Sequence, residues 1–240
     1  MSPNDLWHAL LNHLPWLPGG LFAGYLLVPL ARITAEKVLL DGEVSLEEWR
    51  GPGGGLKEAL PPARRIWVPL LNAGLWICLA NSTSDPAFLS RLPGAGLASA
   101  LILLALIDWD TTLLPDRIVL PLGLSGLAAS WAGLTSQNLP ESAASAAVVA
   151  GIFGGLAWLY RRRRGEDGIG GGDIKLLAAL GAWWGLLDVL YMVVWASVGT
   201  VVWYAVWRWL KRPDPDAEWP FGPAIAAAAL VWSLLAAYSH

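Results

Sequence analysis

The sequence predicts an all-α, polytopic membrane protein with about eight transmembrane helices. Of its 240 residues, 55% are hydrophobic and only 15% are charged, whereas about 25% of the residues in soluble domains are charged. Apolar runs recur along the whole chain and approach the roughly 20 residues that a helix needs to cross a bilayer. Basic residues collect in every second loop, as expected when successive helices cross in opposite directions.

The elements follow from these apolar runs in order. The eight predicted spans cover residues 14–30, 66–80, 94–107, 118–134, 143–160, 174–187, 189–210 and 223–238. Two long polar stretches separate some of them. The first, 32–65, is rich in charged residues and glycine and predicts a flexible loop, in which a capping-box pattern predicts a short helix over 45–49. The second, 161–172, begins with four arginines and ends in glycines.

The basic residues predict the orientation in the membrane. With eight spans, all but Arg91 of the 16 Lys and Arg residues fall on one side. Cytoplasmic loops carry the excess of basic residues, so we expect those loops in the cytoplasm and both termini outside. Arginines 161–164 then act as a topological anchor, and contact with anionic lipid head groups is the alternative.

Carboxylates at the ends of apolar runs are the candidate functional groups, because charge at membrane depth is costly. Asp108 ends the third span directly after the unbroken apolar run 101–107. Asp110 follows two residues later and therefore points to a different helix face. Pro115 breaks the helix and turns the chain toward the next span. Asp116 lies near the water interface, and a solvated turn carboxylate is the alternative interpretation of both Asp110 and Asp116.

Asp173 follows a glycine run and opens the sixth span. Glycines at 168 and 170–172 predict a non-helical segment that approaches another backbone or a ligand closely. Asp173 is then a helix cap or first-turn residue, and a simple cap is the alternative to a functional role. The helix dipole favours negative charge there. Asp108 and Asp173 thus have different surroundings, which is how enzymes separate an acid from a base. Glu166 and Asp167 are interpreted as counterions of the arginines.

Other chemistries lack their motifs. The sequence has no His-Glu-x-x-His, no Gly-x-Ser-x-Gly and no phosphate-binding loop ending in Lys and Ser or Thr. Cys78 is the single cysteine, which excludes an intramolecular disulfide and a cysteine-based zinc site.

Three motifs in order resemble the bacterial type IV prepilin peptidases, which belong to the GxGD intramembrane aspartic proteases. Ile-Asp-Trp-Asp-Thr-Thr-Leu-Leu-Pro-Asp (107–116) is similar to the family's Ile-Asp-x-Asp-x-x-x-Leu-Pro-Asp. Gly-Gly-Gly-Asp (170–173) matches its Gly-x-Gly-Asp, and Pro-Phe-Gly-Pro (220–223) its motif near the last span. The resemblance divides the chain into a first transmembrane helix with a reduced cytoplasmic loop (1–65) and a peptidase membrane domain (66–240).

This resemblance implies a function and a site. Asp108 and Asp173 would be the catalytic pair of a hydrolase that removes the basic leader of type IV prepilins or type II secretion pseudopilins. The enzyme would lie in the bacterial cytoplasmic membrane with its active site facing the cytoplasm. Its partners would be the substrate and the lipid bilayer, with no nucleic acid. The residues expected to support the site are Asp110, Pro115, Asp116, Gly170, Gly172 and Lys175.

The chain departs from the family in its N-terminal third. The family's cytoplasmic loop carries two Cys-x-x-Cys pairs that bind zinc, but residues 32–65 contain no cysteine. A Pro-Leu-Val-Glu pattern appears as Pro69-Leu70-Leu71-Asn72, without the carboxylate. We therefore expect no zinc and a proteolysis that requires no cofactor. Methylation of the product with S-adenosylmethionine is left open.

Two other functions remain open at the level of sequence. One is a proton-coupled transporter, in which carboxylates relay charge and glycines interrupt helices. The other is a pilus-assembly scaffold that has lost its activity. Cleavage of a candidate substrate separates the peptidase from both.

Overall fold

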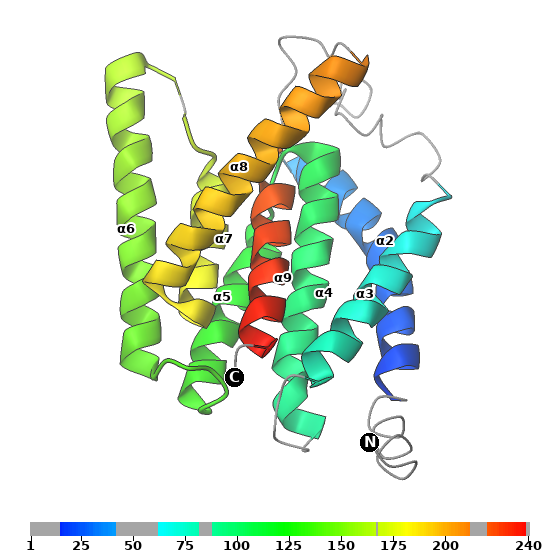
Figure 1. Ribbon diagram of the computed structural model, residues 1–240. Coiled ribbons are helices and arrows are strands. Elements are labelled where there is room, and N and C mark those ends of the chain that lie inside the picture. Colours follow the sequence, from blue (N-terminus) through cyan, green and yellow to red (C-terminus); the bar gives the residue numbers. More distant parts are fainter. Residues whose placement is uncertain (1–14, 42–61, 82–87, 167, 212–219, 239–240) are drawn as a thin grey trace.

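The computed structural model describes residues 15–41, 62–81, 88–166, 168–211 and 220–238. These residues form eight helices and no strand, which confirms the predicted all-α class (Figure 1). The helices are α2 (Trp16–Asp41), α3 (Arg64–Asn81), α4 (Phe88–Thr111), α5 (Asp116–Trp131), α6 (Leu139–Arg164), α7 (Gly171–Trp184), α8 (Leu186–Lys211) and α9 (Gly222–Tyr238).

The length and the apolar composition of the helices are those of a membrane protein. Four are long and apolar enough to cross a bilayer: Trp16–Asp41, Ser90–Thr111, Leu139–Arg164 and Leu186–Trp209. Gly222–Ala236 is a shorter apolar helix. Each predicted span coincides largely with one helix, so the polytopic class is confirmed. The count of eight spans stays a prediction, because the other four helices have only 14 to 18 residues.

The polar stretches are shorter than the sequence predicted. The prediction of a loop from residue 32 was wrong, because α2 continues to Asp41. In this additional part of α2, Arg32 and Glu36 are one turn apart and form an ion pair, with Nε of Arg32 at 3.2 Å from Oε1 of Glu36. At the other end of the stretch, α3 already begins at Arg64. The predicted helix over 45–49 lies outside the described residues.

The four arginines also belong to a helix. They form the last turn of α6, which ends at Gly165 in the left-handed conformation with φ of 77°. Cations are favourable at the negative end of a helix dipole. The polar stretch therefore reduces to the short connection between α6 and α7.

Helix α4 is the central element of the fold (Figure 1). One of its faces packs in a core that it shares with α5 to α9, through Leu97, Leu101 and Leu104. Its opposite face packs against α2 and α3, through Ala98 and Ile102. Of the four long helices, α4 is the most buried. Within its most apolar stretch 56% of the residues are buried, against at most 28% in the other three helices. Both cores therefore determine where the last turn of α4 lies.

Helices α2 and α3 approach each other through glycine. A Cβ on Gly24 would lie 2.5 Å from the Cα of Pro69, and a Cβ on Gly20 would lie 2.6 Å from the Cα of Ala73. Asn72, which is fully buried, donates a hydrogen bond to the carbonyl of Gly20 at 2.8 Å. Small residues and interhelical hydrogen bonds are the usual means of helix association in lipid.

We expect Gly24→Ala to lower the free energy of unfolding by about 1–3 kcal/mol, because the added methyl group meets backbone that has little freedom to move. Unfolding in detergent, followed by circular dichroism, measures this. Gly74→Ala on α3 is the matched control, because its Cβ would have no neighbour within 4 Å. Equal stability of the two variants would contradict the close packing.

Candidate active site

Asp108 is buried at the end of α4, where only 4% of its surface is exposed. Its Oδ2 accepts a hydrogen bond from the backbone N–H of Gly222 at 3.0 Å. Gly222 is the first residue of α9, so the carboxylate faces the positive end of that helix dipole. The N-terminus of α9 therefore stabilises the carboxylate that ends the apolar run of α4.

Gly222 leaves no room for a side chain. A Cβ at this position would lie 2.7 Å from Oδ2 and 2.9 Å from Cγ of Asp108. Glycine lets a backbone N–H come this close to another group. Only the resemblance of Pro-Phe-Gly-Pro (220–223) indicated that this segment matters, and nothing in the sequence indicated that it contacts Asp108.

Asp173 lies in the first turn of α7, which is one of the two positions predicted for it. Its side chain is half-buried and folds back over Gly170, so that a Cβ there would lie 3.2 Å from Oδ2. The prediction that the whole glycine run is non-helical was wrong, because α7 already begins at Gly171. Gly172 in this first turn packs closely against the turn after α4, since a Cβ there would lie 2.8 Å from the Cβ of Leu114.

The structure brings Asp108 and Asp173 together, although they are 65 positions apart in the sequence. Their charges lie close enough to interact. The end of α4 and the beginnings of α7 and α9 meet at the end of the molecule away from the marked C-terminus (Figure 1). Two carboxylates from different helices therefore lie at the same end of the molecule, close enough for their charges to interact.

Asp110 points away from this pair, as its spacing from Asp108 predicted. Both of its oxygens accept hydrogen bonds from the guanidinium of Arg64, each at 2.6 Å. Only 7% of the Asp110 side chain and 11% of the Arg64 side chain are exposed. The alternative of a solvated turn carboxylate was therefore wrong for Asp110. Sequence reasoning missed Arg64, which is 46 positions away and carries no local signal.

Asp116 forms a second, exposed ion pair. Nζ of Lys175 donates to both of its oxygens at 2.7 Å. The pair joins the first residue of α5 to the first turns of α7, and about half of each side chain remains exposed. Asp116 thus lies near water as predicted, but with a partner.

The turn between α4 and α5 connects these aspartates. Pro115 is buried and stands directly before α5, while α4 already ends at Thr111. Thr112 has a φ of 55°, a conformation that β-branched residues rarely adopt. The hydroxyl of the buried Thr111 donates to the carbonyl of Ile107 at 2.8 Å. The turn is therefore an ordered link between the two helices.

Other polar groups lie elsewhere. Asp188 is in the first turn of α8 and has a hydrogen bond with Trp232. Glu166 is exposed, while Asp167 lies outside the described residues, so their role as counterions stays a prediction. Among the described residues, no group of three or more His, Cys, Asp or Glu side chains is placed to hold a metal ion.

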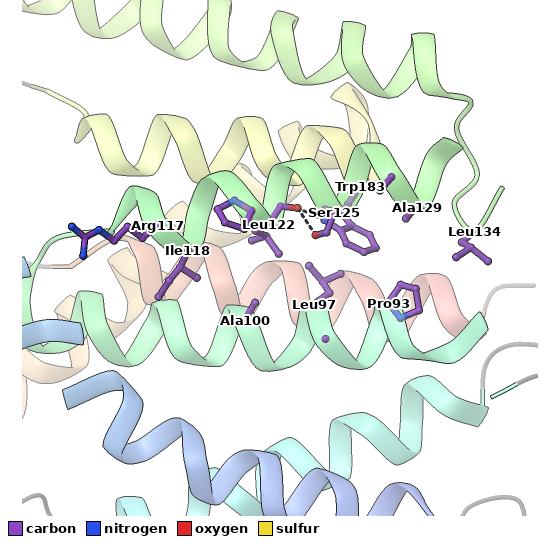
Figure 2. A pocket seen from close by; sticks show the side chains of 13 residues that line it. Pro93, Leu97, Ala100, Arg117, Ile118, Leu122, Ser125, Ala129, Leu134 and Trp183 are labelled. Atoms are coloured by element: carbon purple, nitrogen blue, oxygen red, sulfur yellow. Dashed lines mark hydrogen bonds between the residues drawn. The ribbon is translucent and has the colours of Figure 1, made fainter. Parts of the chain in front are cut away.

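A groove of about 600 Å³ runs between α4 and α5 (Figure 2). Its walls are mostly apolar or small, with Trp183 of α7 closing one side. Arg117 lies at one end and Leu134 at the other. None of the aspartates lines it, so it is separate from the carboxylate pair.

The fold and the site define a helical membrane protein with two interacting aspartates at the ends of its helices. Residues 95–205 match the model of the type IV leader peptidase family. This segment contains both Asp108 and Asp173, and the match confirms the resemblance that the motifs predicted. No solved structure matches the chain.

Several curated relatives carry the same resemblance. The chain is 38% identical over 144 residues to a prepilin leader peptidase/N-methyltransferase of Burkholderia pseudomallei, covering 58% of this chain and 44% of the relative. It is 38% identical over 142 residues to that of Pseudomonas aeruginosa, covering 55% and 46%. For Aeromonas salmonicida the identity is 33% over 186 residues, covering 73% and 60%. The chain thus spans about half the length of the curated relatives it matches.

We expect Asp110→Ala to lower the free energy of unfolding by about 3–5 kcal/mol, because it leaves the buried Arg64 guanidinium unpaired. Asp116→Ala breaks an ion pair that is half exposed and screened by water, so it should cost at most about 1 kcal/mol. Unfolding of the two variants in the same detergent measures both values. A loss for Asp110→Ala no larger than that for Asp116→Ala would contradict the buried ion pair.

Proposed function

We propose that this chain is a membrane aspartic endopeptidase that cleaves the basic leader from type IV prepilins or type II secretion pseudopilins. The observation that carries the proposal is the pair of carboxylates, Asp108 and Asp173, whose charges interact across the ends of two helices. The relatives' name of prepilin leader peptidase supports the substrate. Asp108 and Asp173 are the proposed catalytic residues.

The pair has the groups that peptide hydrolysis needs. One carboxylate, as general base, takes a proton from a water molecule while the water oxygen attacks the scissile carbonyl carbon. The other carboxylic acid protonates the carbonyl oxygen. As the C–N bond breaks, the first carboxyl passes the proton it took from water to the leaving amine, and the second carboxylate takes a proton back from a hydroxyl of the tetrahedral intermediate. Two neighbouring carboxylates that share one proton supply both functions, as in other aspartic proteases.

The neighbours of the pair favour this use. The Gly222 N–H engages one oxygen of Asp108, which leaves the other oxygen for proton transfer. Asp173 lies in the first turn of α7 and is half-buried. Gly170 leaves room for the Asp173 carboxylate, because a Cβ on Gly170 would lie 3.2 Å from Oδ2 of Asp173. Gly170 and Gly222 have no ionisable side chains, so they position the two carboxylates without competing with them for a proton.

The basic residues support an active site that faces the cytoplasm. Arg64 at the start of α3, Arg117 at the start of α5 and the arginines that end α6 lie at the helix ends on the side of the aspartates. The positive-inside rule assigns such an end to the cytoplasm, with both termini outside. Asp110 is bound to Arg64, so we do not expect it to attract the basic leader.

We expect Asp108→Asn and Asp173→Asn each to lower kcat/KM for prepilin cleavage at least about a hundredfold, because each removes a proton-transfer group. Cleavage of a purified prepilin in detergent, followed by gel electrophoresis, measures this. Asp188→Asn is the matched control, since Asp188 is a partly buried carboxylate in the first turn of α8, away from the end of the molecule that holds Asp108 and Asp173 (Figure 1).

Full activity of either variant of the pair would disprove the mechanism. A wild-type protein that binds no prepilin and cleaves none would instead favour a proton-coupled transporter or an inactive pilus-assembly scaffold.

We further expect the cleaved pilin to carry an unmethylated N-terminus. The position that resembles the carboxylate of the family's Pro-Leu-Val-Glu is Asn72, and its amide is engaged on both sides. It donates to the carbonyl of Gly20 and accepts from the hydroxyl of Ser99 at 2.9 Å. The test is to co-express a pilin with this protein in cells that lack another prepilin peptidase. Mass spectrometry of the pilin then shows whether its N-terminus is methylated. A product heavier by one methyl group would contradict the expectation.

A further inference from the structure

The ion pair between Arg64 and Asp110 has a geometry that exposed ion pairs rarely keep. Two parallel hydrogen bonds of 2.6 Å join the guanidinium to the carboxylate, and both side chains are almost fully buried. A two-pronged pair of this kind fixes orientation as well as distance. It joins the first residue of α3 to the last turn of α4.

Stability alone does not account for the pair. Removing two charges from water costs about as much as their attraction returns, and apolar side chains of similar size often serve equally well. Apolar side chains, however, do not form the directional hydrogen bonds that fix the relative orientation of two helices. The position of the pair is therefore informative: Asp110 is two residues from Asp108 in the turn where α4 ends.

The end of α4 is held from two sides. Two residues along a helix correspond to a rotation of about 200°, so Asp108 and Asp110 point in nearly opposite directions. Asp108 contacts the N-terminus of α9, and Asp110 contacts the N-terminus of α3. Beyond them the chain leaves the helix through Thr112, whose φ is 55°. Helix ends fray unless they are fixed, and the pair fixes this end opposite Asp108.

We propose that Arg64 is a positioning residue of the active site: through Asp110 it holds the last turn of α4 so that Asp108 stays on the Gly222 N–H, facing Asp173. This inference rests on the proposed function for its effect on catalysis. Its structural part, the maintenance of the contact between Asp108 and Gly222, does not depend on it.

The test is the double variant Arg64→Met with Asp110→Leu, which replaces the pair by apolar side chains and leaves no buried charge alone. Hydrogen exchange of the Gly222 amide, followed by mass spectrometry, reports the contact with Asp108 directly. We expect exchange about tenfold faster than in the wild type, because loosening the last turn of α4 releases the amide's acceptor. We also expect kcat to fall about ten- to a hundredfold through misplacement of Asp108, with KM unchanged.

The matched control is Arg117→Met with Asp41→Leu, which removes an exposed ion pair between α5 and α2, with N···O at 3.5 Å. It should change neither the Gly222 exchange nor kcat. Arg64→Lys keeps the charge but loses the two-pronged geometry, and it should fall between the wild type and the double variant in both measurements.

The outcomes are distinct. Wild-type exchange at Gly222 in the folded double variant would overturn the positioning role, whatever the enzyme does. A double variant that fails to fold would show that the pair is required for the fold, and Arg64→Lys then decides through the same exchange measurement. A wild-type protein without peptidase activity would refute the proposed function, while the Gly222 exchange would still decide the position of Asp108.

Discussion

The structure depends on one buried carboxylate at the end of an apolar helix. A charged group removed from water needs a hydrogen-bond donor, or its burial is too costly. Asp108 obtains that donor from the backbone of Gly222. Because the donor is a backbone N–H, its position depends on where α9 begins. Four helices lie between the two residues in the chain, and their packing has to return α9 to the end of α4.

Packing on both faces of α4 makes this possible. The core with α5 to α9 and the core with α2 and α3 each use a different side of the helix. A helix held in this way has little freedom to tilt or slide, because interiors are close-packed. Groups on such rigid elements are positioned better than groups on loops. The proposed catalytic pair accordingly lies on helix turns, at the end of α4 and the beginning of α7.

Three aspartates of one short motif have three different environments. Asp108 is buried beside Asp173, Asp110 is buried in an ion pair with Arg64, and Asp116 is half exposed beside Lys175. Their spacing explains the separation, since the first two point to opposite faces of α4 and the third lies beyond the turn at Pro115. One segment thus supplies a proposed catalytic group and two groups that join helices.

The sequence by itself determined the helical class, the approximate position of each helix and the choice of Asp108 and Asp173 as candidate functional residues. These follow from local patterns: apolar runs form helices in lipid, and charges that interrupt such runs stand out. Only the tertiary structure decided which groups form hydrogen bonds with these aspartates. Asp110 meets Arg64 across 46 positions and Asp108 meets Gly222 across 114. No local pattern records such pairs, because they arise when helices distant in sequence pack against the same face of α4.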